Sequence, residues 1–177
     1  EIIEQSEDSI ITKDFLNIND ISINELVRKM DIILRSMMIS LRGSLDEDKY
    51  DSISNMDLDV NRMFFTVLRT IKRCLSNPSL MHALKINSLE IFKLWNVAYQ
   101  MEELADQIKW FCGNMERRKI SGNVKKEMTK LIAEIEEFYL ITMKAYHTND
   151  IETAYKLSTR KNDMISKCMK MCRFSGA

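Results

Sequence analysis

Glu102 and Asp106 are the residues whose spacing most clearly suggests chemistry. They lie four positions apart in the stretch 88–115, where apolar residues recur every three or four positions and predict one long helix. Side chains four residues apart share a helix face, so this spacing places the two carboxylates side by side. Two oxygen ligands on one helix could form part of a site for a hard cation such as Mg²⁺, Mn²⁺ or Fe.

The same two carboxylates could instead pair with nearby bases or meet water. The candidate bases are Arg62, Lys93 and Lys109. Trp95 and Tyr99 fall in the same helix sector as the acids, beside the main apolar stripe. A sector that only faces solvent seldom carries two large rings, so we expect this face to meet a second layer of protein.

Other catalytic or metal-binding patterns are weak. Cys168 and Cys172 lie four residues apart, but a zinc site would need two more ligands, and His82 and His147 are the chain's only histidines. We therefore interpret the cysteines as core or boundary thiols. The sequence has no Ser/His/Asp arrangement, no glycine-rich phosphate loop and no nucleophile elbow. These observations favour a non-catalytic protein.

Composition predicts a helical cytoplasmic protein. The 177 residues include only 4 Gly and 1 Pro, so few turns interrupt the chain, and the 13 Met suit helical cores. The net charge is zero, so we expect no direct nucleic-acid binding by this segment. No apolar run is long enough for a membrane span, and the few cysteines suit a reducing compartment. The chain opens at Glu1 instead of Met, and we expect that an upstream segment has been removed.

Periodicity predicts five long helices after an acidic, partly extended connector at 1–21. Ser22 and Glu25 form a capping box at the first helix start, and Gly43 ends that helix. A short helical turn is expected at 79–84. The five helices are expected at 22–43, 46–77, 88–115, 123–147 and 150–173.

Helices one and two resemble helices four and five at a constant offset of 104 residues. This offset places Leu34 on Phe138 and Ile53 on Leu157, which predicts an internal repeat. The counterpart of the helix at 88–115 would centre near position 206, beyond the end of the chain. The second unit would then lack its third helix and leave apolar surface open. Another copy could cover that surface, or the fifth helix could pack back on the first bundle.

Three segments carry a resemblance to the PhoU-like family of phosphate-uptake regulators. The segment 57–63 (DLDVNRM) looks like the family's second-helix signature, 102–106 (EELAD) is similar to its third-helix signature, and 150–154 (DIETA) is similar to the start of its fifth helix. The resemblance implies an all-α fold of tandem three-helix bundles. The first would occupy 22–115, and 116–177 would be a partial second repeat. ELVRKMDIILRSMM suggests the archaeal branch, in which an AbrB-type DNA-binding domain precedes this region.

Family members often bind metal clusters through these acidic motifs. Carried over to this chain, the resemblance implies a divalent or ferric ion at one acidic site, and Lys161 and Ile165 in the second half replace the acidic and polar residues expected there. Glu103 and Gln107 also depart from the family's usual Arg and His. The residues implied as metal ligands are Asp57, Asn61, Glu102 and Asp106.

The resemblance implies a regulatory, protein-binding module in phosphate-responsive signalling or transcriptional control. Its expected partners are a phosphate transporter, a sensor kinase or a fused upstream DNA-binding domain. A homodimer or higher homo-oligomer is also expected. Two alternatives remain open: a regulator of potassium transport with the same fold, and a metal-carboxylate bundle for storage or catalysis.

Overall fold

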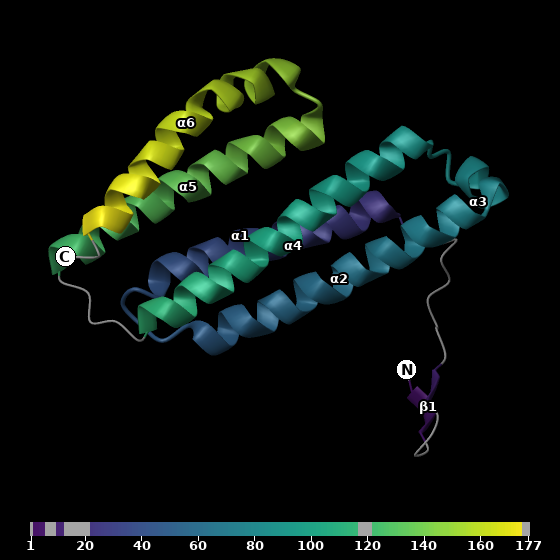
Figure 1. Cartoon of the computed structure of the whole chain (residues 1–177), viewed down its shortest axis with the longest axis horizontal. Helices are drawn as coiled ribbons and strands as arrows, with labels where there is room; N and C mark the ends of the chain where they lie inside the picture. The colour runs from purple at the N-terminus through teal and green to yellow at the C-terminus, as the bar shows by residue number, and fades with distance from the viewer. Residues whose placement is uncertain (1, 6–9, 13–21, 117–121, 175–177) are drawn as a thin grey trace.

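The structure, a computed structural model, describes residues 2–5, 10–12, 22–116 and 122–174. It is an all-α helical bundle preceded by a short antiparallel β-hairpin (Figure 1). Five long helices confirm the prediction from periodicity, and a sixth, short helix occupies the expected turn. The elements are β1 (Ile2–Gln5), β2 (Ile10–Thr12), α1 (Ile23–Gly43), α2 (Tyr50–Ser76), α3 (Pro78–Ala83), α4 (Ser88–Glu116), α5 (Gly122–Thr148) and α6 (Ile151–Phe174).

Polar side chains cap several helices as the sequence predicts. The Ser22 hydroxyl accepts a hydrogen bond from the Glu25 amide at the start of α1. Asn77 ends α2, and its side chain caps α3 by accepting from the amide of Leu80. At the start of α6, the Asp150 carboxylate accepts from the Thr153 amide at 3.0 Å. These caps supply partners for amides that have none within their own helix.

The start of α2 differs from the sequence prediction by four residues. We expected it near Asp46, but α2 begins at Tyr50. The Gly43 carbonyl accepts from the amides of Asp46 and Glu47, so this segment forms a turn first. The Asp48 carboxylate then accepts from the Tyr50 amide. Local hydrogen bonds of this kind compete with helix formation and delay the helix start.

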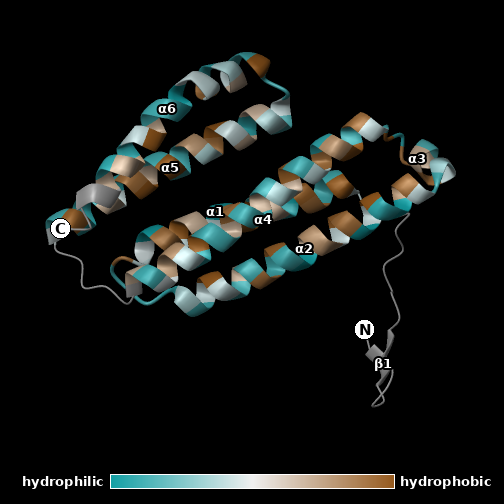
Figure 2. Cartoon of the chain, viewed as in Figure 1, coloured by the Kyte–Doolittle hydropathy of each residue, from teal (hydrophilic) through white to brown (hydrophobic). Residues whose placement is uncertain are grey.

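The main core lies between α1, α2 and α4, which pack against one another. Apolar residues concentrate on the inner faces of these helices, while polar residues cover most of the outside (Figure 2). Burial of this apolar stripe is the main source of helix stability here. Side chains with little or no exposure at the centre of the core are Met30, Leu34, Met37, Ile53, Val60, Val67, Ala98 and Ala105.

The helices α5 and α6 form a second antiparallel pair that joins the first bundle through α5. Helix α5 packs along α1, and α6 packs along α5 (Figure 1). The helix that packs back on the first bundle is therefore α5, the fourth long helix, and not the fifth. Outside the α1–α5 core contact, Lys125 pairs with Asp46 at 2.5 Å and Arg42 pairs with Glu136 at 3.1 Å.

Positions paired by the predicted repeat agree in burial at one core pair and differ at a polar pair. Ile53 in α2 and Leu157 in α6 are both buried, in keeping with the offset of 104. Asp57 is buried, whereas its counterpart Lys161 is exposed. Helix α4 covers the side of α2 that carries Asp57. Among the described residues, no helix covers the corresponding side of α6. The division of the chain into two related units stays a prediction.

None of the helices in the described ranges combines the length and the apolar character needed to cross a membrane.

Candidate functional site

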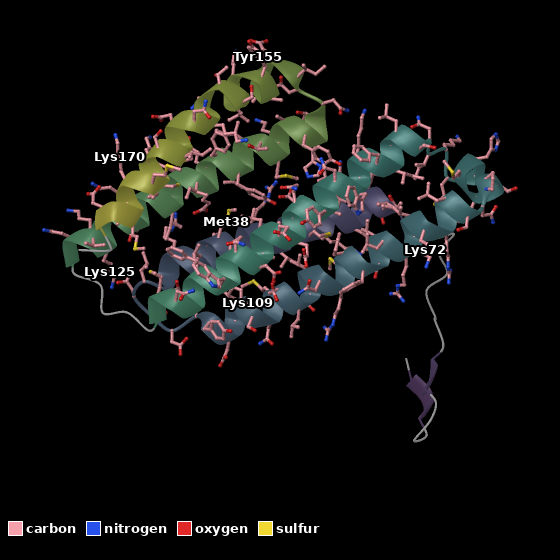
Figure 3. All side chains as sticks on the ribbon, viewed as in Figure 1. Met38, Lys72, Lys109, Lys125, Tyr155 and Lys170 are labelled. Carbon is pink, nitrogen blue, oxygen red and sulfur yellow. The ribbon has the colours of Figure 1, made fainter. Side chains whose placement is uncertain are left out.

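The structure brings three of the four predicted metal ligands to one place between α2 and α4. Asp57 is buried, with 1% of its surface exposed, and its Oδ2 lies 2.5 Å from Nζ of Lys109. The Lys109 ammonium also lies 3.5 Å from Asp106 Oδ1. Asn61 Nδ2 donates to the same Asp57 oxygen at 3.4 Å. Of the three bases left open as partners, Lys109 is the one that Asp106 contacts, and Figure 3 shows Lys109 on α4.

Charges around this site shift two pKa values in ways that follow from the geometry. The hydrogen bond to Asp57, together with the charges of Asp57 and Asp106, raises the pKa of Lys109. Partial burial raises the pKa of Glu102, and repulsion from Asp106, Glu103 and Asp57 raises it further. Glu102 therefore belongs to the same electrostatic cluster, although no contact pairs it with a base.

A metal ion and Lys109 would compete for the same carboxylates. Asp57 Oδ1 is buried without a hydrogen-bond partner among the described residues, which leaves one oxygen available as a ligand. However, the Lys109 ammonium already supplies a cation between Asp57 and Asp106. In the part of the chain that the structure describes, no three His, Cys, Asp or Glu side chains are placed to hold a metal. Metal binding therefore stays a prediction.

A row of five contacting aromatic rings, which we call the aromatic strip, crosses the outer face of α2 and α4. Trp95 and Tyr99 stack with ring centroids 5.9 Å apart, and Phe92 contacts Trp95 at 6.0 Å. Phe64 links the two helices because it contacts Tyr99 at 6.4 Å and its neighbour Phe65 at 6.1 Å. Each ring thus supports the next one.

Four of the five rings of the aromatic strip are exposed, Phe64 is buried, and Tyr99 borders the acidic cluster. Trp95 and Tyr99 are 38% and 37% exposed, and Phe65 and Phe92 are each 60% exposed. A hydrogen bond to the Glu103 carboxylate raises the pKa of the Tyr99 phenol, so the middle ring of the row touches the acids of α4. The expected second layer over this face is therefore not supplied by the described residues of this chain. Exposed contiguous apolar surface of this kind typically marks an interaction site.

A second buried carboxylate, Asp31 in α1, joins α1 to α5. Asp31 is 3% exposed and accepts from Nε of Arg35 at 3.0 Å and from its Nη2 at 2.7 Å. From α5, the Tyr139 hydroxyl donates to Asp31 Oδ1 at 3.0 Å, and His147 Nε2 lies 3.0 Å from Oδ2. We call these four residues the Asp31 cluster.

The Asp31 cluster stabilises the ionised carboxylate in spite of its burial. Burial alone would raise the pKa of Asp31, but the hydrogen bonds from Arg35, Tyr139 and His147 lower it overall. Burial raises the pKa of Tyr139, and the neighbouring Asp31 charge adds to this effect, so the phenol keeps its proton and remains a donor. This arrangement meets the requirement that a buried charge be paired and hydrogen-bonded.

A groove of about 800 Å³ opens beside the Asp31 cluster, between the start of α1, the α3–α4 connection and the end of α5. Its charged lining contains three bases, Arg28, Lys85 and Lys93, and two acids, Glu25 and Glu90. All five are exposed. A lining of both signs does not select one class of charged ligand.

Comparison with protein-family models, with curated proteins and with solved structures gives no match to this chain. The geometry of the site therefore carries the functional argument beside the sequence resemblance.

Sequence reasoning did not find the Asp31 cluster. Asp31 directly follows Met30 in the apolar stripe of α1, and this position was the available signal, because a charge beside a core position needs a partner. Its partners Tyr139 and His147 lie more than 100 residues away, and periodicity does not pair distant helices.

The other histidine, His82, is exposed. Cys74 and Cys112 are buried and Cys168 is half-buried, in keeping with the prediction of core or boundary cysteines, and the side chain of Cys172 lies outside the described residues.

Proposed function

We propose that this chain is a regulatory, protein-binding module of the PhoU-like kind that acts in phosphate-responsive control. The observation that supports this proposal best is the aromatic strip. Tryptophan and tyrosine dominate the binding energy of many protein interfaces, especially where several rings lie together. The stacking of Trp95 on Tyr99 holds both rings in place before any partner binds, which lowers the entropy cost of association.

The chemistry around the aromatic strip indicates the kind of partner. Glu102, Glu103 and Asp106 follow the rings along α4 and leave an acidic border, relieved only by Lys109. A matching surface would present apolar side chains beside basic ones, as a basic amphipathic helix does. Such a helix could belong to a phosphate transporter, a sensor kinase or an upstream DNA-binding domain.

The buried polar groups support a non-catalytic role. Both fully buried carboxylates are engaged with bases, Asp57 with Lys109 and Asp31 with Arg35. Lys109 belongs to α4 and Arg35 to α1, so both bases come from helices of the bundle. We therefore infer that the two acids contribute to helix packing. We place the module in the cytoplasm, in keeping with its few cysteines, and propose that it works as a homo-oligomer.

The test replaces the rings in the cell that makes this protein. A Trp95→Ala, Tyr99→Ala double variant should abolish the response of phosphate-uptake transcription to external phosphate, measured with a reporter at high and low phosphate. Trp110→Ala is the matched control, because Trp110 is an exposed tryptophan of α4 outside the aromatic strip. Circular dichroism should show that both variants stay folded.

Two results would count against the proposal. An unchanged phosphate response in the double variant would remove the aromatic strip from the function. A loss of potassium uptake with an intact phosphate response would instead favour the regulator of potassium transport.

A further inference from the structure

A second exposed apolar surface runs along α6, far from the aromatic strip. At about 100° per residue, its side chains lie within an arc of about 80° on the helix. Ile151 is 83% exposed and Tyr155 is 72% exposed, and Tyr155 projects away from the rest of the molecule (Figure 3). We call this surface the α6 stripe, and it consists of Ile151, Tyr155, Ser158, Asn162, Ile165 and Met169.

The α6 stripe is distinct from the face by which α6 packs on α5. Buried Leu157 and half-buried Met164 and Cys168 mark the α5-facing side, whose centre lies about 120° around the helix from the stripe. A helix whose only apolar contact was α5 would need a single apolar face. The helix therefore carries a second contact surface that the described part of the chain does not cover.

The order of side chains in the α6 stripe is symmetric about position 160. Ile151 and Met169 are equidistant from that position, and so are Tyr155 and Ile165. Ser158 and Asn162 form the third equidistant pair. If two copies of α6 lie antiparallel with a twofold axis at position 160, each apolar residue meets an apolar residue of the other copy. The two polar residues then meet in the middle, where they can form a hydrogen bond.

The charges beside the α6 stripe fit the same arrangement. In an antiparallel pair with a twofold axis, the same edge of each helix faces its counterpart. Glu152 and Lys170 share one edge, and the twofold axis brings Glu152 of one copy to within about 3 Å, measured along the helix axis, of Lys170 of the other. Lys156 and Asp163, on the same edge, are brought together in the same way. All four side chains are exposed and able to change partners.

We propose that a second copy of this chain covers the α6 stripe, forming a twofold-symmetric dimer through antiparallel α6 helices. This self-complementary order of apolar, polar and charged residues is what an isologous interface requires. The proposal deepens the homo-oligomer of the proposed function and rests on it, while using none of the aromatic strip. A single helix pair buries less than the roughly 1,600 Å² of a standard interface, so the dissociation constant should be on the order of micromolar.

The first test measures association of the native chain by sedimentation equilibrium. The native chain should form a dimer at concentrations of about 100 μM. A Tyr155→Glu, Ile165→Glu double variant should weaken dimerisation at least 100-fold, because it places carboxylates on both sides of the interface. Phe92→Glu is the matched control, since Phe92 is as exposed as Met169 but belongs to the aromatic strip. It should leave the dimer intact.

A charge exchange tests the orientation of the helices. Glu152→Lys alone should weaken the dimer, because it brings two lysines together across the interface. Adding Lys170→Glu in the same chain should restore the affinity, since the pair is re-formed with its signs exchanged. In a dimer that uses another face, the second substitution would not rescue the first.

Disulfide formation gives an independent measure of the register. The tests use a chain with Cys168→Ser and Cys172→Ser, because these native cysteines lie next to position 169 and could react with a cysteine at 151 of the other copy. In that chain, the Ile151→Cys, Met169→Cys double variant should form a covalent dimer under mild oxidation. Ile151→Cys alone should not, since the two copies of position 151 would lie about 27 Å apart along the helices. The parent chain, oxidised in parallel, gives the background from its remaining cysteines.

A monomeric native chain, or a dimer that survives the Tyr155→Glu, Ile165→Glu substitutions, would overturn this inference. Covalent coupling through Ile151→Cys alone would also overturn it, because that result requires parallel helices. A monomer that still supports the phosphate response would leave the aromatic-strip proposal standing, so the two proposals fail separately.

Discussion

Replacing Asp31 by Asn is the sharpest test of how α5 is held on the first bundle. The substitution keeps the size and shape of the side chain but removes its charge. Asp31 accepts two hydrogen bonds from Arg35 and one from Tyr139, and it contacts His147. The interactions with Tyr139 and His147 connect α5 to α1. The perturbation thus acts on a single contact point between the two helix groups.

The expected loss follows from the number and type of these interactions. A hydrogen bond to a charged group contributes about 1.5–3 kcal/mol, and breaking a buried ion pair costs about 3–5 kcal/mol. Two factors reduce this value here: Arg35 is 40% exposed and can turn to water, and an Asn oxygen can still accept. We therefore expect Asp31→Asn to lower the free energy of unfolding by about 2–3 kcal/mol. For a chain of this size that corresponds to a decrease in Tm of roughly 6–9 °C.

Differential scanning calorimetry measures the size of the effect, and hydrogen exchange measures its location. Amides of α5 and α6 should exchange faster in Asp31→Asn, while those of α2 and α4 should change little. Asp163→Asn is the matched control, because Asp163 is an exposed acid whose only pair in the described structure is a 3.6 Å contact with Lys167. It should change stability by no more than about 0.5 kcal/mol.

A double-mutant cycle adds the pairwise contribution of the Tyr139 hydroxyl. Tyr139→Phe and Asp31→Asn should be non-additive, because the first removes and the second weakens the same hydrogen bond. Additive effects would mean that the two groups do not interact. A decrease in Tm below about 1 °C in Asp31→Asn, or faster exchange spread evenly over α1–α4, would refute the reasoning.

Three further predictions follow from the same charges. The pKa of Asp31 is lowered, so its contribution to stability is present above its unfolded pKa near 3.9 and is lost as pH falls through the lower folded value. The difference in Tm between the native and Asp31→Asn proteins should therefore be constant above about pH 5 and shrink steadily as pH falls below about 3.9, and a difference that does not shrink would contradict this. The pKa of Glu102 is raised, so its charge destabilises the fold once pH rises above the unfolded value near 4.3. Glu102→Gln should therefore raise Tm at pH 7 but not at pH 3. An unchanged Tm at pH 7 would refute the assigned repulsion. Since Lys109 competes with any metal ion, Lys109→Gln should bind Mn²⁺ more tightly than the native chain in equilibrium dialysis, and equal binding would argue against Asp57 and Asp106 as ligands.

The sequence was sufficient to predict the helices, because their signals are local. The apolar period of α1 and the capping pair Ser22 and Glu25 lie within a few residues of each other, and both are found in the structure. The helix period also placed Glu102 in the sector of Tyr99, whose pKa the charge of Glu102 helps to raise. Each of these inferences depends only on helix geometry.

Features that depend on contact between distant helices were not predictable in the same way. Lys109 was one of three candidate bases for the acids, and its bond to Asp57, 52 residues away, depends on how α4 lies on α2. Arg62, another candidate, pairs with Asp59 in its own helix instead. The Asp31 cluster required the position of α5 on α1, which no local pattern specifies.

That cluster also fixes the register of α5. A shift of α5 along α1 by one turn would move Tyr139 and His147 about 5.4 Å away from Asp31 and leave a buried carboxylate without these two donors. Apolar contacts alone would tolerate such a shift, because stripes of Met, Leu and Ile repeat along both helices. Asp31 would keep Arg35 of its own helix, but the loss of two donors to a buried charge would instead cost about 3 kcal/mol or more in every shifted state. One acid in a methionine-rich seam thus separates the native alignment from its near neighbours, and removing it should populate several alignments of the same two helices.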